Sequence, residues 1–137
     1  MKKIIFSLII SLLFILNANA QEHKVVIQIS SDDPKVQNLA LNNAVNLQKI
    51  YGVDNIEIEV VAYGPGLSVL TTKYENKERV KSLSMQEIVF SACENTIQNI
   101  ERKTGKTPEL IEGVTTVKAG VARIIELQEE GYSYIRP

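Results

Sequence analysis

Cys93 is the only cysteine in this chain of 137 residues and the residue best suited to nucleophilic chemistry. It follows residues 87–92, which are predicted to form a strand, and precedes residues 94–103, which are predicted to form a helix. Unpaired amides and the helix dipole in the first turn of a helix favour a thiolate over a thiol. An exposed, ionisable thiol is therefore one interpretation of Cys93, at the point where a strand ends and a helix begins.

Two interpretations of Cys93 stay open at this level. A lone cysteine in an exported protein suggests a reactive thiol or an intermolecular pairing, whereas free cysteine is also among the most often buried residue types. The neighbouring carboxylate of Glu94 disfavours ionisation through its negative charge. Asn95 and Thr96 are expected to provide hydrogen bonds, either to a sulfur anion or to the end of the helix.

Glycines mark two further segments that could line a binding site. Gly64 and Gly66 flank a proline in the turn at residues 63–66, where the lack of a side chain lets the backbone approach a bound group. A tight turn without a ligand explains this pattern equally well. Gly120 begins a predicted helix, whose first amides could hold an anion. The chain has no Gly-x-Gly-x-x-Gly or Gly-Lys-Ser/Thr motif, so no nucleotide cofactor is expected.

The remaining polar candidates favour structural roles. Asp32 and Asp33 are adjacent and could hold a cation or act as acid and base, but Pro34 follows them, and an acid before such a proline usually caps a helix. His23 is the only histidine, which excludes a histidine-based triad and a multi-histidine metal centre. We expect His23 to lie at a solvated terminus and no metal to bind.

Short apolar runs alternate with amphipathic segments along most of the chain. Strands are predicted at residues 24–30, 55–62, 87–92, 113–117 and 132–135. Helices are predicted at residues 35–51, 94–103 and 120–130, with a short helical turn at 67–73 and a charged segment at 75–84. This alternation predicts an α/β domain with a mostly parallel sheet of about five strands, covered on both faces.

Ligands of open parallel sheets bind beyond the carboxyl ends of the strands. Four segments are predicted to lie at that edge: residues 31–33, 63–66, 92–96 and 118–120.

Residues 1–20 have the order of a secretory signal peptide, with cleavage expected after Ala20. Two lysines precede an uncharged apolar stretch at residues 4–16, and small residues follow it. A membrane anchor is the alternative, but a spanning helix needs about 20 apolar residues and this run is shorter. Residues 21–137 have the size of a single domain, with no membrane span after cleavage.

Without residues 1–20 the chain carries 13 basic and 16 acidic residues, a formal charge of −3. Such a surface does not attract phosphate backbones, and the basic residues are scattered rather than grouped in a stripe. Nucleic acid is therefore not expected as a partner. Export predicts an envelope protein, with the periplasm as the expected compartment.

The chain resembles the DsrE/DsrF-like family, in particular its small exported branch, over nearly all of residues 23–137. The similar segments are residues 23–30 (HKVVIQIS), 63–67 (YGPGL), 90–97 (FSACENTI), 120–128 (GVARIIELQ) and 131–137 (GYSYIRP). The resemblance implies a three-layer flavodoxin-like fold and homo-oligomers. It also implies that Cys93 carries sulfur as a persulfide, in exchange with a donor or acceptor protein or a small sulfur compound.

Three functions are compatible with these features. The first is a sulfurtransferase-like carrier in which Cys93 accepts sulfur, Gly64 and Gly66 shape the pocket, and amides near Asn95 and Gly120 hold the sulfur anion. The second is a non-catalytic module that binds a small molecule or anion. The third is an oligomeric structural or stress protein of the cell envelope. The chain has no second cysteine to resolve a persulfide, so the first function requires an external acceptor.

Overall fold

The computed structural model describes residues 23–137, so the predicted signal peptide at residues 1–20 lies outside the described residues. Five strands form one sheet in the order β4-β3-β2-β1-β5, and neighbouring strands are all parallel. The strands are β1 (His23–Ile29), β2 (Ile56–Ala62), β3 (Ile88–Cys93), β4 (Thr115–Val117) and β5 (Ser133–Ile135). The predicted α/β class and parallel sheet are confirmed.

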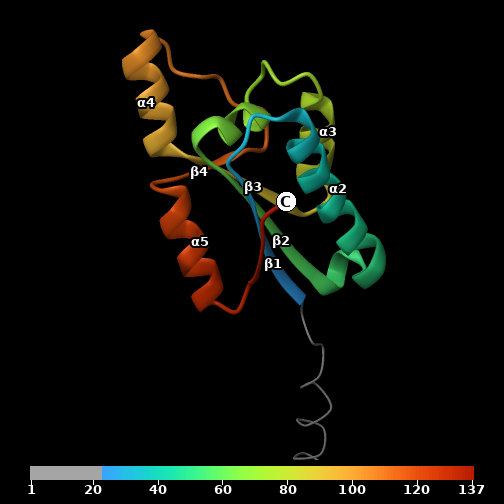
Figure 1. Ribbon diagram of the computed structural model, residues 1–137. Coiled ribbons are helices and arrows are strands. Elements are labelled where there is room, and N and C mark those ends of the chain that lie inside the picture. The colour runs from blue at the N-terminus through green and yellow to red at the C-terminus, as the bar shows by residue number, and fades with distance from the viewer. Residues whose placement is uncertain (1–22) are drawn as a thin grey trace, which may run out of the picture.

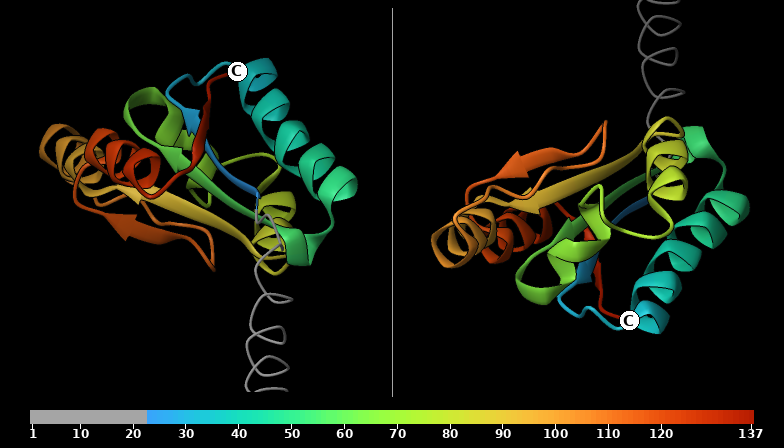
Figure 2. Two further views of the ribbon diagram at one scale, coloured as in Figure 1. Left: turned by 90° about the horizontal axis from the view of Figure 1, so that it is seen from below. Right: turned by 90° about the horizontal axis from the view of Figure 1, so that it is seen from above.

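Helices lie on both sides of this sheet, as in flavodoxin-like proteins (Figures 1 and 2). The α-helices are α2 (Pro34–Tyr51), α3 (Lys77–Ser84), α4 (Glu94–Thr104) and α5 (Gly120–Glu129), and the 3-10 helices are η1 (Val53–Asn55) and η2 (Gly64–Leu70). Helices α2 and α3 cover one face, and α5 covers the other. Helix α4 extends past the carboxyl edge of β3 and has no buried residue. The helical turn expected at residues 67–73 begins earlier, at Gly64.

The larger apolar core lies between the sheet and the layer of α2, α3 and η2. Fully buried side chains of the central strands, such as Ile27 and Phe90, pack there against Leu41 of α2. Helix α2 begins where Asp33 accepts a hydrogen bond of 2.8 Å from the amide of Lys35. The expected capping role of Asp33 is thereby confirmed.

The core on the α5 face is smaller and is flanked by an ion pair in which Glu59 is buried and Arg123 is partly exposed. Its buried apolar residues are Val26, Val61, Ile124 and Leu127. The guanidinium of Arg123 donates to both carboxylate oxygens of Glu59, at 2.9 and 2.7 Å, and the Ser91 hydroxyl donates to the same carboxylate at 2.7 Å. The hydrogen bond to Glu59 raises the pKa of Arg123 above its ordinary value, so its charge is permanent. This network ties α5 to β2 and β3.

The ends of the described chain are packed rather than free. His23 is the first residue of β1 and stacks on Tyr51 with ring centroids 3.8 Å apart, so the expectation of a solvated terminus is wrong. Tyr132 donates a hydrogen bond to Glu57, and burial is the main cause that raises the pKa of Tyr132. Tyr134 donates to the side chain of Gln28 at 2.7 Å.

Within residues 23–137, no helix combines the length and the apolar character needed to cross a lipid bilayer.

Replacing Arg123 with methionine should strongly destabilise the domain, because it leaves the carboxylate of Glu59 buried without its cation. Breaking a fully buried ion pair in this way costs about 3–5 kcal/mol, and the partial exposure of Arg123 places the expected loss at or below the lower end of that range. The double variant Glu59→Gln with Arg123→Met should lose less than the two single variants together. Urea unfolding followed by circular dichroism measures all three. The control Arg102→Met, on exposed α4, should change stability by less than about 0.5 kcal/mol; an equal loss in both arginine variants would contradict the role of the pair.

Candidate functional site

Cys93 ends β3 at the carboxyl edge of the sheet and is the N-cap residue of α4. The predicted position at a strand end and helix start is therefore correct, but the thiol is buried, with only 5% of the residue exposed. Of the two interpretations that the sequence left open, the buried cysteine is therefore the one observed, and the start of α5 contributes to the cover over the sulfur. For a buried sulfur at a helix N-terminus, the surrounding hydrogen-bond donors determine how readily the thiol ionises.

Those donors make the Cys93 sulfur more acidic than an ordinary cysteine. Burial is the largest single influence on the pKa of the thiol and raises it. The Thr96 hydroxyl and the backbone amides of Gly120, Thr96 and Asn95 together lower the pKa by more than burial raises it, so the pKa lies below its ordinary value. As a neutral thiol, Cys93 makes no side-chain capping hydrogen bond. The donors therefore act mainly on the thiolate, which attracts amides and hydroxyls more strongly than a thiol does.

Thr96 connects the sulfur to the turn after β2. Its hydroxyl oxygen accepts a hydrogen bond of 2.9 Å from the amide of Gly64. Its hydroxyl hydrogen stabilises the thiolate of Cys93 and so lowers the pKa of that thiol. An amide that donates to a hydroxyl polarises it and makes it a better donor in turn. The φ angle of Gly64, +55°, lies in the left-handed region that glycine adopts without strain.

Three of the four predicted loop segments meet around Cys93. The amide of Asn95 donates to the carbonyl of Lys118 at 3.3 Å, so this amide is shared between that carbonyl and the sulfur. A Cβ at Gly120 would lie 3.0 Å from the ring of Tyr63, so a side chain there would crowd Tyr63 and glycine favours the close approach of α5. Residues 63–64, 93–96 and 118–120 thus enclose the sulfur.

The other predicted residues serve packing and capping. A Cβ at Gly66 would lie 2.2 Å from the carbonyl oxygen of Ile29, so Gly66 packs against the end of β1 and does not face the sulfur. The segment at residues 31–33 caps α2 and does not join the site. The carboxylate of Glu94 accepts a hydrogen bond of 3.0 Å from Thr116, and Glu94 is not among the groups that shift the pKa of Cys93.

A groove of about 820 Å³ adjoins the thiol site between η2, α4 and the loop at residues 106–109. Gly64 and Thr96 belong both to the groove wall and to the hydrogen-bond chain that ends at Cys93. The groove was not predicted from the sequence, because it forms between segments that are distant along the chain. The feature of the sequence that could have indicated the groove is the pair of lysines at residues 103 and 106.

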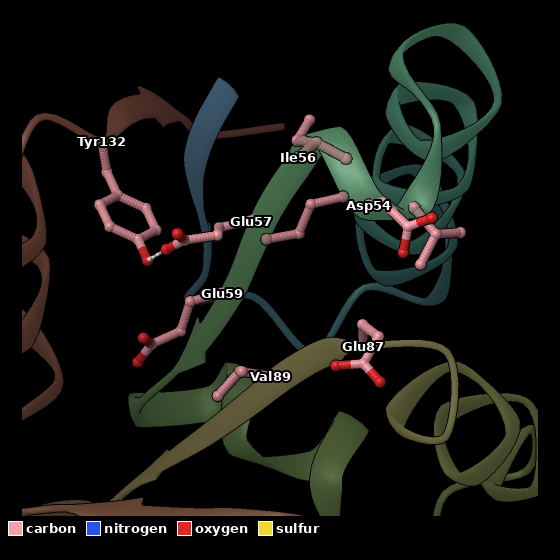
Figure 3. Close-up of a pocket in the computed structure, with 9 residues that line it drawn as sticks. Asp54, Ile56, Glu57, Glu59, Glu87, Val89 and Tyr132 are labelled. Atoms are coloured by element: carbon pink, nitrogen blue, oxygen red, sulfur yellow. Dashed lines mark hydrogen bonds between the residues drawn. The ribbon is translucent and has the colours of Figure 1, made fainter. Parts of the chain in front are cut away.

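A second, acidic pocket lies at the opposite end of the sheet (Figure 3). It has a volume of about 350 Å³, and Asp54, Glu57, Glu59 and Glu87 contribute to its lining. Figure 3 shows that the Glu57 carboxylate points to Tyr132 rather than into a shared centre. Among residues 23–137 no group of three or more acidic, histidine or cysteine side chains could hold a metal ion. Cys93 is therefore the chemically most distinctive group at either end of the sheet.

The geometry around Cys93 suits sulfur exchange at a thiolate. Attack of a thiolate on a sulfur–sulfur bond needs no general base, since the nucleophile is already ionised and the leaving group is another thiolate. The surrounding donors stabilise negative charge, whether it lies on the thiolate or on a terminal sulfur bonded to it. The donors around Cys93 form a preorganised environment for negative charge on its sulfur.

Comparison with known proteins gives a consistent result. The sequence model of the DsrE/DsrF-like family matches residues 23–137. The chain is 38% identical to MTH1491, a protein of unknown function from Methanobacterium thermoautotrophicum, over 85% of this chain and 100% of that chain, with a TM-score of 0.76. The ychN protein from E. coli is 13% identical over 85% of this chain and 99% of that chain, with a TM-score of 0.64, a similarity of fold alone. No match is found among curated proteins.

Replacing Thr96 with valine should slow alkylation of Cys93 at pH 7 by about 10-fold or more, because a hydrogen bond to a charged group contributes about 1.5–3 kcal/mol. Loss of a donor to the thiolate raises the pKa of the thiol, so the rate should reach its plateau only at higher pH. Stopped-flow iodoacetamide kinetics from pH 5 to pH 10 measure this profile. The control Thr96→Ser keeps the hydroxyl and should keep the wild-type profile; identical profiles for valine and wild type would refute the role of Thr96.

Proposed function

This chain belongs to the DsrE/DsrF-like family, and we propose on that basis that it is an exported sulfur carrier whose Cys93 accepts sulfur as a persulfide. Proteins of this family often take part in sulfur relay. The observation that carries the proposal is the set of four donors directed at the Cys93 sulfur, which lowers the pKa of the thiol despite its burial. A cysteine that merely fills the core has no need of such an environment.

Loading of Cys93 is a balanced exchange. The thiolate attacks the outer sulfur of a donor R–S–SH, a new sulfur–sulfur bond forms, and the donor bond breaks as its electron pair leaves with R–S⁻. The products are Cys93–S–SH and the donor thiolate, so no oxidant or cofactor is consumed. Amides of Asn95, Thr96 and Gly120 then stabilise the ionised persulfide as they stabilise the thiolate.

Unloading requires a thiol from outside the chain. Cys93 is the only cysteine in the sequence, so no internal thiol can attack the persulfide. An acceptor thiolate R′–S⁻ attacks the outer sulfur and leaves with it as R′–S–SH, which restores the Cys93 thiolate. This sequence of steps makes the protein a carrier between two partners rather than a hydrolase of sulfur compounds.

The location of this function depends on the first 20 residues. Their charged, apolar and small-residue order supports export and cleavage after Ala20. An oxidising compartment favours a protein with a single cysteine over one with two, because a neighbouring pair would be prone to close into a disulfide. We place the carrier in the periplasm.

Intact mass spectrometry of the protein isolated from its own cell envelope tests the proposal. The expected mass is that of residues 21–137 plus one sulfur atom, and dithiothreitol should remove the extra mass. Oxidation of Cys93 to a sulfinic acid adds two oxygen atoms, which weigh nearly the same as one sulfur atom. Dithiothreitol distinguishes the two products, because it removes a persulfide sulfur but does not reduce a sulfinic acid. The Cys93→Ser variant should lack the adduct, and Thr96→Ser should keep it. An adduct that survives in Cys93→Ser, or a thiol never found loaded, would refute a carrier role.

Self-association is the second part of the proposal. Proteins of this family commonly oligomerise. On the face covered only by α5, the apolar side chains of Val121 and Ile125 are 54% and 53% exposed, and Val89 of β3 is 46% exposed. Val121 and Ile125 lie one helical turn apart, so they form a continuous apolar stripe. We infer that a second copy of the chain covers this stripe.

The substitution Ile125→Glu should convert the oligomer to a monomer, because it places a charge in the buried centre of the contact. Size-exclusion chromatography with light scattering at micromolar concentration measures the mass. The control Ile50→Glu alters an apolar residue of α2 that is 74% exposed and should leave the oligomer intact. A wild-type protein that is monomeric, or an oligomer that survives Ile125→Glu, would contradict this interface.

A further inference from the structure

The groove beside the thiol has an excess of positive charge. Lys73, Lys103 and Lys106 line it, against the single carboxylate of Glu109. None of these three ammonium groups has an ion-pair partner within residues 23–137. The carboxylate of Glu109 already accepts a hydrogen bond of 3.2 Å from Thr72. Since the exported chain as a whole is acidic, a groove with unpaired lysines favours an anionic ligand.

The groove runs along one face of α4. Thr96, Asn99, Ile100 and Lys103 all line it, at the spacing of residues that share a helix face. Thr96 is the residue whose hydroxyl lowers the pKa of Cys93, and Lys103 lies about two turns further, roughly 10 Å along the helix axis. A ligand that reaches both ends therefore carries its negative charge about 10 Å from its reactive atom.

The groove has the size of a site for an organic ligand. Its volume of about 820 Å³ falls in the range of pockets that hold drug-sized molecules, about 300–1,000 Å³. Sulfide or thiosulfate would leave most of it empty and could not bridge the distance to Lys103. A molecule as long as an extended tripeptide, about 10 Å, spans it. The hydroxyls of Ser68 and Thr71 in the wall already donate to the carbonyls of Pro65 and Ser68, so towards a ligand their oxygens can only accept hydrogen bonds, for example from peptide-like amides.

We propose that this groove binds the sulfur donor, and that the donor is a carboxylate-bearing organic persulfide of about tripeptide size, with its outer sulfur at Thr96 and its carboxylate at the lysines. This inference rests on the proposed carrier function of Cys93. The step is the exchange written above: the Cys93 thiolate takes the outer sulfur, and the donor leaves as its thiolate. The lysines hold the donor by charge, so its binding weakens as salt is added.

Binding without chemistry is the first arm of the test. The probe is S-methylglutathione, which carries carboxylates but no transferable sulfur, titrated by calorimetry into the Cys93→Ser protein. The double substitution Lys103→Gln with Lys106→Gln should weaken binding by about 5-fold or more, and so should an increase in salt. The control pair Lys35→Gln with Lys49→Gln, on exposed positions of α2, should not. No binding of the probe, or equal binding by both variants, would overturn the inference.

Sulfur transfer is the second arm, and it separates failure of the groove from failure of the carrier. Wild-type protein is mixed with glutathione persulfide, thiosulfate or inorganic polysulfide, and loading of Cys93 is followed by intact mass. Glutathione persulfide should load fastest, and only its rate should fall in the Lys103→Gln, Lys106→Gln variant. Equal loading by polysulfide in all variants, with no preference for glutathione persulfide, would overturn the groove but keep the carrier. If no donor loads Cys93, the proposed carrier function is refuted, and the proposed role of the groove in binding a sulfur donor is refuted with it.

Discussion

The ion pair between Arg123 and Glu59 is the interaction on which the rest of the site depends. Glu59 lies in the middle of a buried strand, and Arg123 lies in the first turns of α5, so the pair fixes where that helix begins. Because the start of α5 is fixed, the amide of Gly120 is held over the sulfur of Cys93. The side of the sheet that holds the pair has few buried apolar residues. The ion pair therefore adds to the apolar packing of Ile124 and Leu127 in setting the position of α5.

The sequence predicted the parts of the structure that depend on local patterns. The alternation of strands and helices, the cap at Asp33 and the place of Cys93 between β3 and α4 follow from periodicity and from turn residues. Asn95, Thr96 and Gly120 were also correctly placed at the edge of the sheet, since parallel strands bring their following loops together.

The parts that were missed depend on contacts between distant segments. Gly120 lies against the Cys93 sulfur and the turn at Gly64 binds Thr96 beside it, and no local pattern links either segment to residue 93. Glu59 stood out as an acid within an apolar strand, but its partner is found only once α5 is docked. The close approach of Gly66 to Ile29, and the stacking of His23 on Tyr51, likewise become visible only in three dimensions.

Helix α4 has no fully buried residue, and its partly buried Ile97 and Ile100 pack against the core, so contacts of its first turn add to a modest apolar attachment. The amides of that turn are among the groups that stabilise the Cys93 thiolate. Ionisation of the sulfur and the stability of the folded first turn are therefore thermodynamically linked. Because the pKa of the folded thiol is lowered, this contribution to stability is complete above the pKa of an unfolded cysteine and disappears as pH falls through the folded value. Protonation of the sulfur therefore removes a stabilising contribution from the start of α4. The thiol site thus links the charge of one atom to the stability of the fold around it.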